Sequence, residues 1–299
     1  MKILVTGSAG FLGRSFCESV DADGIEVVGM DISLPPVGTR YRQSQCDLST
    51  ADLTALIRAE QPDRIVHFAG NANVGLSVQD PHMDLNGSYV LLHRLLYGAK
   101  AAGCRARILF VSSAAVYGNP SRIPIHEDDI RRPVSPYGLH KAACEDLCEY
   151  FSRVEGIDCR IVRIFSAYGS GLRKQILWDL CTKLRSPGPV EMFGTGAETR
   201  DFIHVADVVQ AIRLVLESGK PGAYNLANGT EVRIDELARA LLAAAGEPID
   251  RLRFNGRTKE GDPLNWKADI GRLQALGYRP TLSLEQGVLD YWHWRSALG

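Results

Sequence analysis

The N-terminal stretch constrains the fold more than any other part of the chain. The apolar run KILVTG, residues 2–7, is rich in strand-forming residues, and the glycines of TGSAGFLG follow it directly. Gly7, Gly10 and Gly13 allow a tight strand–helix turn whose backbone can approach a pyrophosphate at the helix N-terminus. The motif therefore predicts dinucleotide binding, and a strand–helix turn without a ligand is the alternative.

The first half of the chain repeats this strand–helix pattern. Apolar runs alternate with amphipathic stretches, and the runs are EVVGMD, RIVHFAG, RILFVSS and CRIVRIF. Continuous apolar strands separated by helices are typical of a parallel sheet that is covered on both faces. We therefore predict an α/β fold with a doubly wound parallel sheet, the Rossmann architecture, followed by a smaller C-terminal substrate-binding region.

The second apolar run ends in an acidic residue that suits a ribose. Asp31 in VVGMDIS follows the glycines at about the twenty-residue spacing of dinucleotide-binding folds. A carboxylate at this place binds the ribose hydroxyls of adenosine and repels a 2′-phosphate, so NAD is favoured over NADP. A solvated loop aspartate is the alternative.

Composition and charge argue against several other classes of protein. The formal net charge of −1 gives no long-range attraction to nucleic acid or to an anionic membrane. No apolar run approaches the roughly 18 residues of a membrane span, and the chain opens within its first strand, so we expect neither an anchor nor a secretory leader. The seven cysteines form no CxxC pair, which predicts reduced, mainly core-packed thiols in a cytoplasmic protein without a metal site.

A tyrosine and a lysine stand on one face at the start of a predicted helix. Tyr137 and Lys141 in SPYGLHKAACEDLCEYF are four residues apart. A phenol is protonated at neutral pH and becomes a base only where a nearby cation stabilises the phenolate. Lys141 and a positively charged nicotinamide can both supply that charge. The pair predicts acid–base chemistry beside the cofactor, and an exposed pair at chance spacing is the alternative.

Several blocks together resemble the extended short-chain dehydrogenase/reductase family of nucleotide-sugar enzymes. They are TGSAGFLG, HFAG at 67–70, SSAAVYG at 112–118 and the tyrosine–lysine pair, and later RIFSAYG, FGTGAETRDFIHVADVV, YNLANG and EGDPLNWKADIGRLQALGY. The resemblance covers essentially the whole chain. It implies an NAD-binding Rossmann domain over residues 1–165, with a return near 201–227, and a region over 166–299 that mainly binds the nucleotide-sugar.

The resemblance also implies site residues. Tyr137 would be the catalytic base or acid, Lys141 would hold the nicotinamide ribose, and Ser113 would bond the sugar hydroxyl that is oxidised. Tyr137, Lys141, the three glycines and Asp31 would contact the cofactor. The other cofactor contacts would be Phe11, Leu12, Asp47, Leu48, Phe68, Ala69, Gly70 and Phe165. The substrate would meet Ser113, Tyr137, Ser166, Arg200, Arg257 and Lys259. Arg200 would grip the diphosphate through paired charge-assisted bonds, with a surface salt bridge to Asp201 as the alternative.

The residues after Ser113 distinguish branches of the family. Ala114 and Ala115 occupy the two positions at which sugar 4,6-dehydratases carry a pair that resembles Asp-Glu. The acid and base that remove water in those enzymes are therefore missing here. HFAGNANVGLSVQDP and YWHW are most similar to UDP-glucose (UDP-galactose) 4-epimerases. We therefore expect an NAD-dependent nucleotide-sugar 4-epimerase, in which hydride leaves sugar C4 for NAD and returns to the opposite face. A 4-keto-sugar reductase and a dinucleotide-sensing regulatory protein are the alternatives.

Departures from the family pattern leave the nucleotide, the sugar and the pathway open. Ser166 and Asp84 each replace an asparagine, Ala206 replaces an aspartate, and Lys259 replaces an arginine. The resemblance also implies a homodimer, built from the helical stretches 87–103 and 137–151.

Overall fold

A parallel sheet forms the larger part of the molecule. The computed structural model describes residues 1–34, 38–257 and 265–298. Within these ranges, seven strands pair in the order β11-β6-β5-β4-β1-β2-β3, and every pairing is parallel. The strands are β1 Lys2–Thr6, β2 Glu26–Asp31, β3 Arg42–Gln45, β4 Arg64–His67, β5 Arg107–Ser113, β6 Cys159–Ile164 and β11 Gly222–Leu226. This arrangement confirms the predicted doubly wound α/β fold.

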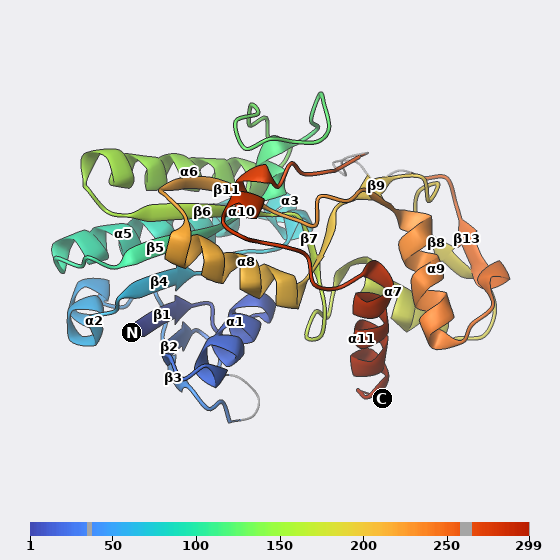
Figure 1. The fold of residues 1–299 in the computed structure, drawn as a ribbon, viewed down its shortest axis with the longest axis horizontal. Helices are drawn as coiled ribbons and strands as arrows, with labels where there is room; N and C mark the ends of the chain where they lie inside the picture. The colour runs from blue at the N-terminus through green and yellow to red at the C-terminus, as the bar shows by residue number, and fades with distance from the viewer. Residues whose placement is uncertain (35–37, 258–264, 299) are drawn as a thin grey trace.

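Helices cover both faces of the sheet (Figure 1). One face packs against α1 Phe11–Ala22 and α8 Val205–Ser218, and the other packs against α2 Leu53–Glu60, α5 Leu91–Ala101 and α6 Pro136–Val154. Successive strand side chains point to opposite faces, so in β1 Ile3 and Val5 join the first core and Leu4 joins the second. Burying each such side chain contributes about 1.5–3 kcal/mol.

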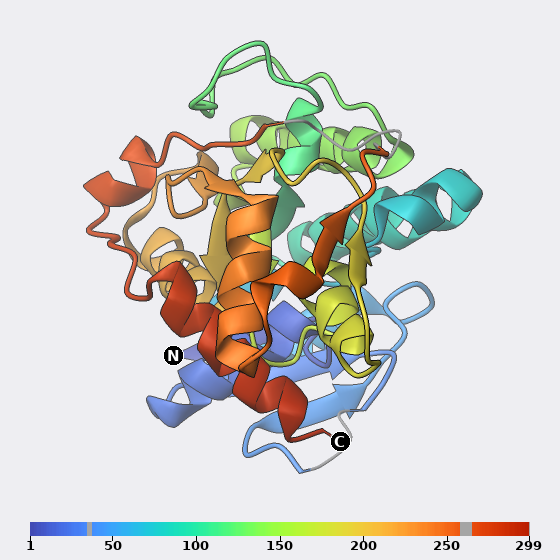
Figure 2. The ribbon, with the colours of Figure 1, turned by 90° about the vertical axis from the view of Figure 1, so that its right-hand side faces the viewer.

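A smaller part follows β6 and lies beside the sheet, on the right of Figure 1 and in front in Figure 2. Its helices, α7 Gln175–Leu184, α9 Ile234–Ala245 and α11 Leu284–Ser296, enclose a core of their own. Three short strand pairs complete it: β7 Ser166–Tyr168 with β10 Phe202–His204, β8 Val190–Met192 with β13 Leu252–Phe254, and β9 Thr199–Arg200 with β12 Val232–Arg233. Between these segments, α8 and β11 rejoin the large sheet.

Short elements connect the larger ones. They are α3 Val74–Gln79, α4 Pro81–Leu85, the π-helix η1 Asn86–Val90, the 3₁₀ helices η2 Ala114–Tyr117 and η3 Ile249–Arg251, and α10 Gly271–Ala275. Cys144 and Cys148 of α6 pack in the core, as predicted. Among the described residues no helix combines the length and the apolar character that a membrane crossing needs.

A buried charged network joins α6 to the sheet. The carboxylate of Glu145 is fully buried, and it accepts hydrogen bonds from Arg163 Nη2 of β6 at 2.7 Å and from Ser112 Oγ of β5 at 2.5 Å. Arg131 Nη1 donates to the same carboxylate at 3.2 Å. Buried ions are tolerated only when their bonding capacity is satisfied, as it is at this carboxylate.

We expect Glu145→Gln to lower the free energy of unfolding by about 3 kcal/mol, because the buried Arg163 guanidinium loses its counter-charge. Urea denaturation measures the change. Glu149→Gln, at an exposed position on the same helix, is the control and should cost less than about 0.5 kcal/mol. Equal losses in the two variants would show that the network does not hold α6.

Candidate active site

The glycine turn after β1 forms a cradle that has no room for side chains. Gly7 has a φ of +74°, and a Cβ there would lie 2.5 Å from the backbone N of Ala69. A Cβ on Gly13 would lie 2.1 Å from Gly7 O. The N-cap of α1 is Gly10, which offers no side-chain cap to the first N–H groups. These open N–H groups and the bare backbone fit a pyrophosphate.

Asp31 lies at the end of β2, beside this turn. Its Oδ2 accepts a hydrogen bond from Ala9 N at 3.0 Å, and its Oδ1 accepts one from Ser33 N at 3.0 Å. The carboxylate therefore holds the glycine turn against the second strand, a contact that the sequence analysis missed. Because the residue is only half-buried, acceptor capacity remains for a ribose hydroxyl.

The other predicted cofactor residues occupy different environments. Phe68, Ala69 and Gly70 follow β4 at the same edge, where Phe68 N donates to Thr6 O at 2.9 Å. Asp47 is exposed after β3, whereas the side chain of Leu48 is in the core between the sheet and its helices.

Aromatic residues at this edge connect the two parts of the molecule. Phe11 packs against the core of the smaller part, whereas the neighbouring Leu12 packs against the core of the sheet. Phe165 is buried, and its ring meets Trp266 edge-on at 5.8 Å between centroids.

Tyr137 and Lys141 meet at the carboxyl end of β5. Ser135 Oγ caps α6 by accepting from Gly138 N, and Pro136 occupies the first turn, so the helix begins directly before the tyrosine. Lys141 is almost fully buried, and its Nζ donates to Val111 O at 2.9 Å. The same Nζ lies 5.8 Å from the centroid of the Tyr137 ring.

Ser113 belongs to the same strand end. It lies two residues after Val111, is half-buried, and its Oγ accepts from Ala115 N at 3.2 Å. Residues i and i+2 of a strand share a face, and η2, which Ser113 caps, packs on α6. The predicted serine, tyrosine and lysine thus come from neighbouring elements at one edge of the sheet.

A buried histidine beneath the lysine was not predicted. His67 ends β4, and its Nδ1 lies 2.7 Å from Thr6 Oγ1. Burial, and secondarily the charge of Lys141, lowers the pKa of the imidazole to about 3, so His67 is neutral at physiological pH. It adds no positive charge to that of Lys141. HFAG contains this histidine, but its burial depends on strands distant in sequence.

The other predicted substrate residues that the structure describes, Ser166, Arg200 and Arg257, belong to the smaller part. Ser166 begins β7, and its N donates to Asp201 O at 3.0 Å. Arg200 is half-buried: its Nη1 donates to Thr199 O at 2.8 Å, and its guanidinium carbon lies 5.8 Å from the ring centroid of Trp266.

The neighbours of Arg200 differ in their exposure. Asp201, the alternative partner proposed for Arg200, is fully buried and accepts from the backbone N–H groups of Asn228 and Ala268. Arg257 is exposed, and Lys259 lies outside the described residues.

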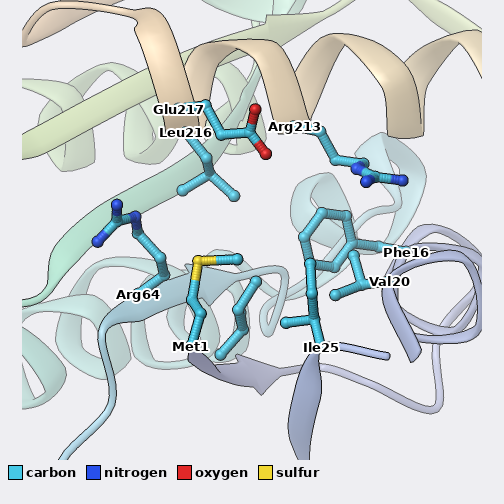
Figure 3. Close-up of a pocket in the computed structure, with 9 residues that line it drawn as sticks. Met1, Phe16, Val20, Ile25, Arg64, Arg213, Leu216 and Glu217 are labelled. Carbon is cyan, nitrogen blue, oxygen red and sulfur yellow. The ribbon is translucent and has the colours of Figure 1, made fainter. Parts of the chain in front are cut away.

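Two surface depressions lie elsewhere, between α1 and α8. Figure 3 shows one, in which Arg213 and Glu217 of α8 lie above Phe16 and Val20 of α1. The second is lined by α1 and α8 residues, including Ser19 and Gln210. None of the predicted site residues lines either depression, and we place the candidate site at the carboxyl edge of the sheet on its side-chain geometry.

The fold, the glycine cradle and the tyrosine–lysine pair define a dinucleotide-binding enzyme of the extended short-chain dehydrogenase/reductase class. Comparison with protein families matches residues 3–227 to the NAD dependent epimerase/dehydratase family. The chain belongs to this family.

Relatives of more than one activity match the chain over nearly its whole length. A UDP-glucose 4-epimerase of Mycolicibacterium smegmatis is 30% identical over 96% of each chain. A GDP-6-deoxy-D-mannose reductase of Pseudomonas aeruginosa is 28% identical over 98% of each. Among solved structures, MoeE5 in complex with UDP-glucose and NAD matches with a TM-score of 0.89 and 29% identity over the whole of both chains.

Proposed function

We propose that this enzyme is a UDP-sugar 4-epimerase. The observation that carries the proposal is the grouping of Ser113, Tyr137 and Lys141 at the end of β5, beside Ala114 and Ala115. Two alanines offer no second acid or base for removing water, whereas epimerisation needs only one proton carrier. The similarity to UDP-glucose 4-epimerases supports the same activity.

The chain's own residues provide the proton chemistry. Tyr137 removes the proton of the sugar 4-hydroxyl while Ser113 holds that oxygen, and the buried Lys141 ammonium stabilises the phenolate. NAD, held by the glycine turn and Asp31, would supply the acceptor and donor of the C4 hydride. After the 4-keto sugar has presented its other face, Tyr137 returns the proton to the same oxygen. Proton and hydride are both restored, so the reaction is balanced.

We propose the cofactor contacts that the resemblance implies. The glycine turn would bind the pyrophosphate and Asp31 the adenosine ribose. Residues 68–70 would line the cleft, and Phe11, Leu12, Asp47, Leu48 and Phe165 would border it. Because the side chain of Leu48 is in the core, only its backbone can serve. Residues 1–165 with the return at 201–227 would form the NAD domain, and 166–299 would mainly bind the nucleotide-sugar.

A panel assay tests the activity. We expect the purified protein to interconvert a UDP-hexose and its 4-epimer without added reductant, followed by nuclear magnetic resonance of the sugar. A reductase would instead convert a 4-keto sugar only with a supplied reduced dinucleotide, and a sensor would turn over neither. The panel should include uronic-acid and GDP-linked sugars, because relatives of both kinds are similar to the chain.

Replacing the base tests the mechanism. Tyr137→Phe should lower kcat by about 100- to 10,000-fold, the range of general acid–base catalysis, while the fold and NAD binding persist. Kinetics on the best panel substrate measure the loss, and thermal melting with and without NAD provides the control. Near-normal turnover in this variant would refute the assigned role.

Arg200→Ala tests the nucleotide-linked substrate. If Arg200 binds the diphosphate, calorimetry should show a roughly 10- to 100-fold loss of affinity for UDP, because each charge-assisted bond contributes about 1.5–3 kcal/mol. Arg233→Ala, at an exposed position on the paired strand β12, is the matched control and should bind UDP normally. Wild-type UDP affinity in Arg200→Ala would assign the arginine a structural role. Ser166 and Arg257 are proposed as further contacts, and Lys259 stays a prediction from sequence.

We propose a cytoplasmic homodimer that pairs α5 and α6 of two subunits. Tyr97 of α5 is 43% exposed, and Val154 of α6 is 56% exposed. The ring of Tyr97 also packs edge-on against that of Phe151 of α6, with 5.0 Å between the ring centroids, so the two helices are adjacent. Large exposed apolar side chains on adjacent helices are typical of an interface. Light scattering should give twice the mass of one chain at micromolar concentration, and Val154→Asp should shift it toward the monomer. A monomeric wild type would contradict the proposal.

A further inference from the structure

A buried aspartate–histidine pair lies next to the tyrosine–lysine pair. Asp84 of α4 is fully buried, and His140 of α6 leaves 12% of its side chain exposed. His140 Nδ1 lies 2.5 Å from Asp84 Oδ2, and Asn71 Nδ2 donates to Asp84 Oδ1 at 2.6 Å. Each carboxylate oxygen therefore has a partner, supplied by a different segment.

His140 lies in the turn of α6 that carries the proposed catalytic residues. His140 follows Tyr137 by three residues and immediately precedes Lys141. On the same side, Tyr137 N donates to the buried Ser77 Oγ at 3.1 Å. The segment 74–85 thus contacts the start of α6 through two hydrogen bonds. The bond between Ser77 and Tyr137 joins neutral groups, and the bond between Asp84 and His140 joins ionisable ones.

The charges of Asp84 and Lys141 reach the same region of α6. Burial raises the pKa of the Cys144 thiol to about 12, while Lys141 lowers it and Asp84 raises it. A bare carboxylate here would oppose the stabilisation that Lys141 gives to a phenolate. A buried carboxylate is retained when a counter-charge and hydrogen bonds compensate it, and His140 is the neighbour that can provide both.

The surrounding titratable groups do not replace this compensation. His67, at the end of β4, is neutral, and Asp80 and His82 are exposed at the start of α4. Other titratable or charged side chains on elements packed against α6 include Tyr89 of η1, Tyr117 of η2, and His93, Arg94, Tyr97 and Lys100 of α5. Arg163 of β6 and Arg131 of the preceding loop also approach the helix, which itself carries Tyr137, Lys141, Cys144, Glu145 and Asp146. Glu145 is already paired with Arg163.

We propose that His140 is a positioning residue that neutralises the buried charge of Asp84, so that the charge of Lys141 acts undiminished on the Tyr137 phenol. The pair acts through Tyr137. The inference rests on the proposed role of Tyr137 as the base of the epimerase.

His140→Gln separates charge from geometry, because glutamine keeps a donor for Asp84 but carries no charge. We expect the acidic limb of the pH profile of kcat/KM to move up by about one pH unit, with KM little changed. One uncompensated charge has this effect at roughly 12 Å in a medium of effective dielectric constant about 20. The upward direction follows because an unpaired carboxylate disfavours the phenolate.

Two further variants complete the test. Asp84→Asn/His140→Gln is neutral at both positions and should restore the wild-type limb. Asp84→Asn alone removes the carboxylate that would oppose the phenolate, so its limb should not rise. His82→Gln, on the exposed side of α4, is the control and should behave as wild type. A limb that does not move in His140→Gln, or that moves equally in the double variant, overturns the proposal.

A readout independent of turnover distinguishes this inference from the proposed function. The ultraviolet phenolate absorbance of each protein, minus that of the same protein carrying Tyr137→Phe, reports the ionisation of Tyr137 alone. We expect the midpoint to rise in His140→Gln and to return in the double variant. An unchanged midpoint in His140→Gln overturns the inference even if the enzyme epimerises its substrate. If the wild type epimerises no sugar, the proposed function is refuted, and this titration still tests whether His140 acts on the Tyr137 phenol. If His140→Gln loses its cooperative melt, a raised midpoint in Asp84→Asn overturns the inference.

Discussion

Parallel pairing of the central strands is the constraint on which the site depends. Parallel strands end at one common edge of the sheet, so the residues that follow them gather there whatever their distance in sequence. Gly7, Asp31, Phe68 and Ser113 reach one edge for this reason. α6 begins at the same edge and packs over β5 and β6, and the ammonium of Lys141 donates a hydrogen bond to the carbonyl of Val111.

Buried polar groups that are hydrogen-bonded to one another lie next to the site. The carboxylate of Glu145 accepts hydrogen bonds from Arg163 and from Ser112, the residue before Ser113 in β5. Such a network contributes little net stability, but it is costly to break, because each partner left alone would be a buried, unsatisfied group. It therefore favours a single arrangement of β5 against α6, and a reaction that transfers a proton and a hydride needs that geometry.

Local patterns predicted the sheet, the glycine turn and the tyrosine–lysine pair, because each depends on spacing within one element or one turn. The contacts that were missed join residues far apart in sequence. The carboxylate of Asp31 bonds Ala9, His140 bonds Asp84, and His67 is buried by neighbouring strands. Leu48 shows the same limit, since its neighbour Asp47 is exposed while its own side chain enters the core. The short strand pairs of the smaller part, such as β8 with β13, also form over long sequence separations.

Phe11 follows the glycine turn and yet packs against the core of the smaller part, close to Gly171. The backbone proposed to hold the pyrophosphate is therefore attached to the other half of the molecule by an apolar contact. The shape of the proposed dinucleotide site therefore depends on how the two parts pack against each other, and a change in that packing would alter how firmly the cofactor is held. An enzyme that returns each hydride to its own substrate gains from firm retention, since a long cofactor residence time spares it from recruiting a new dinucleotide between turnovers.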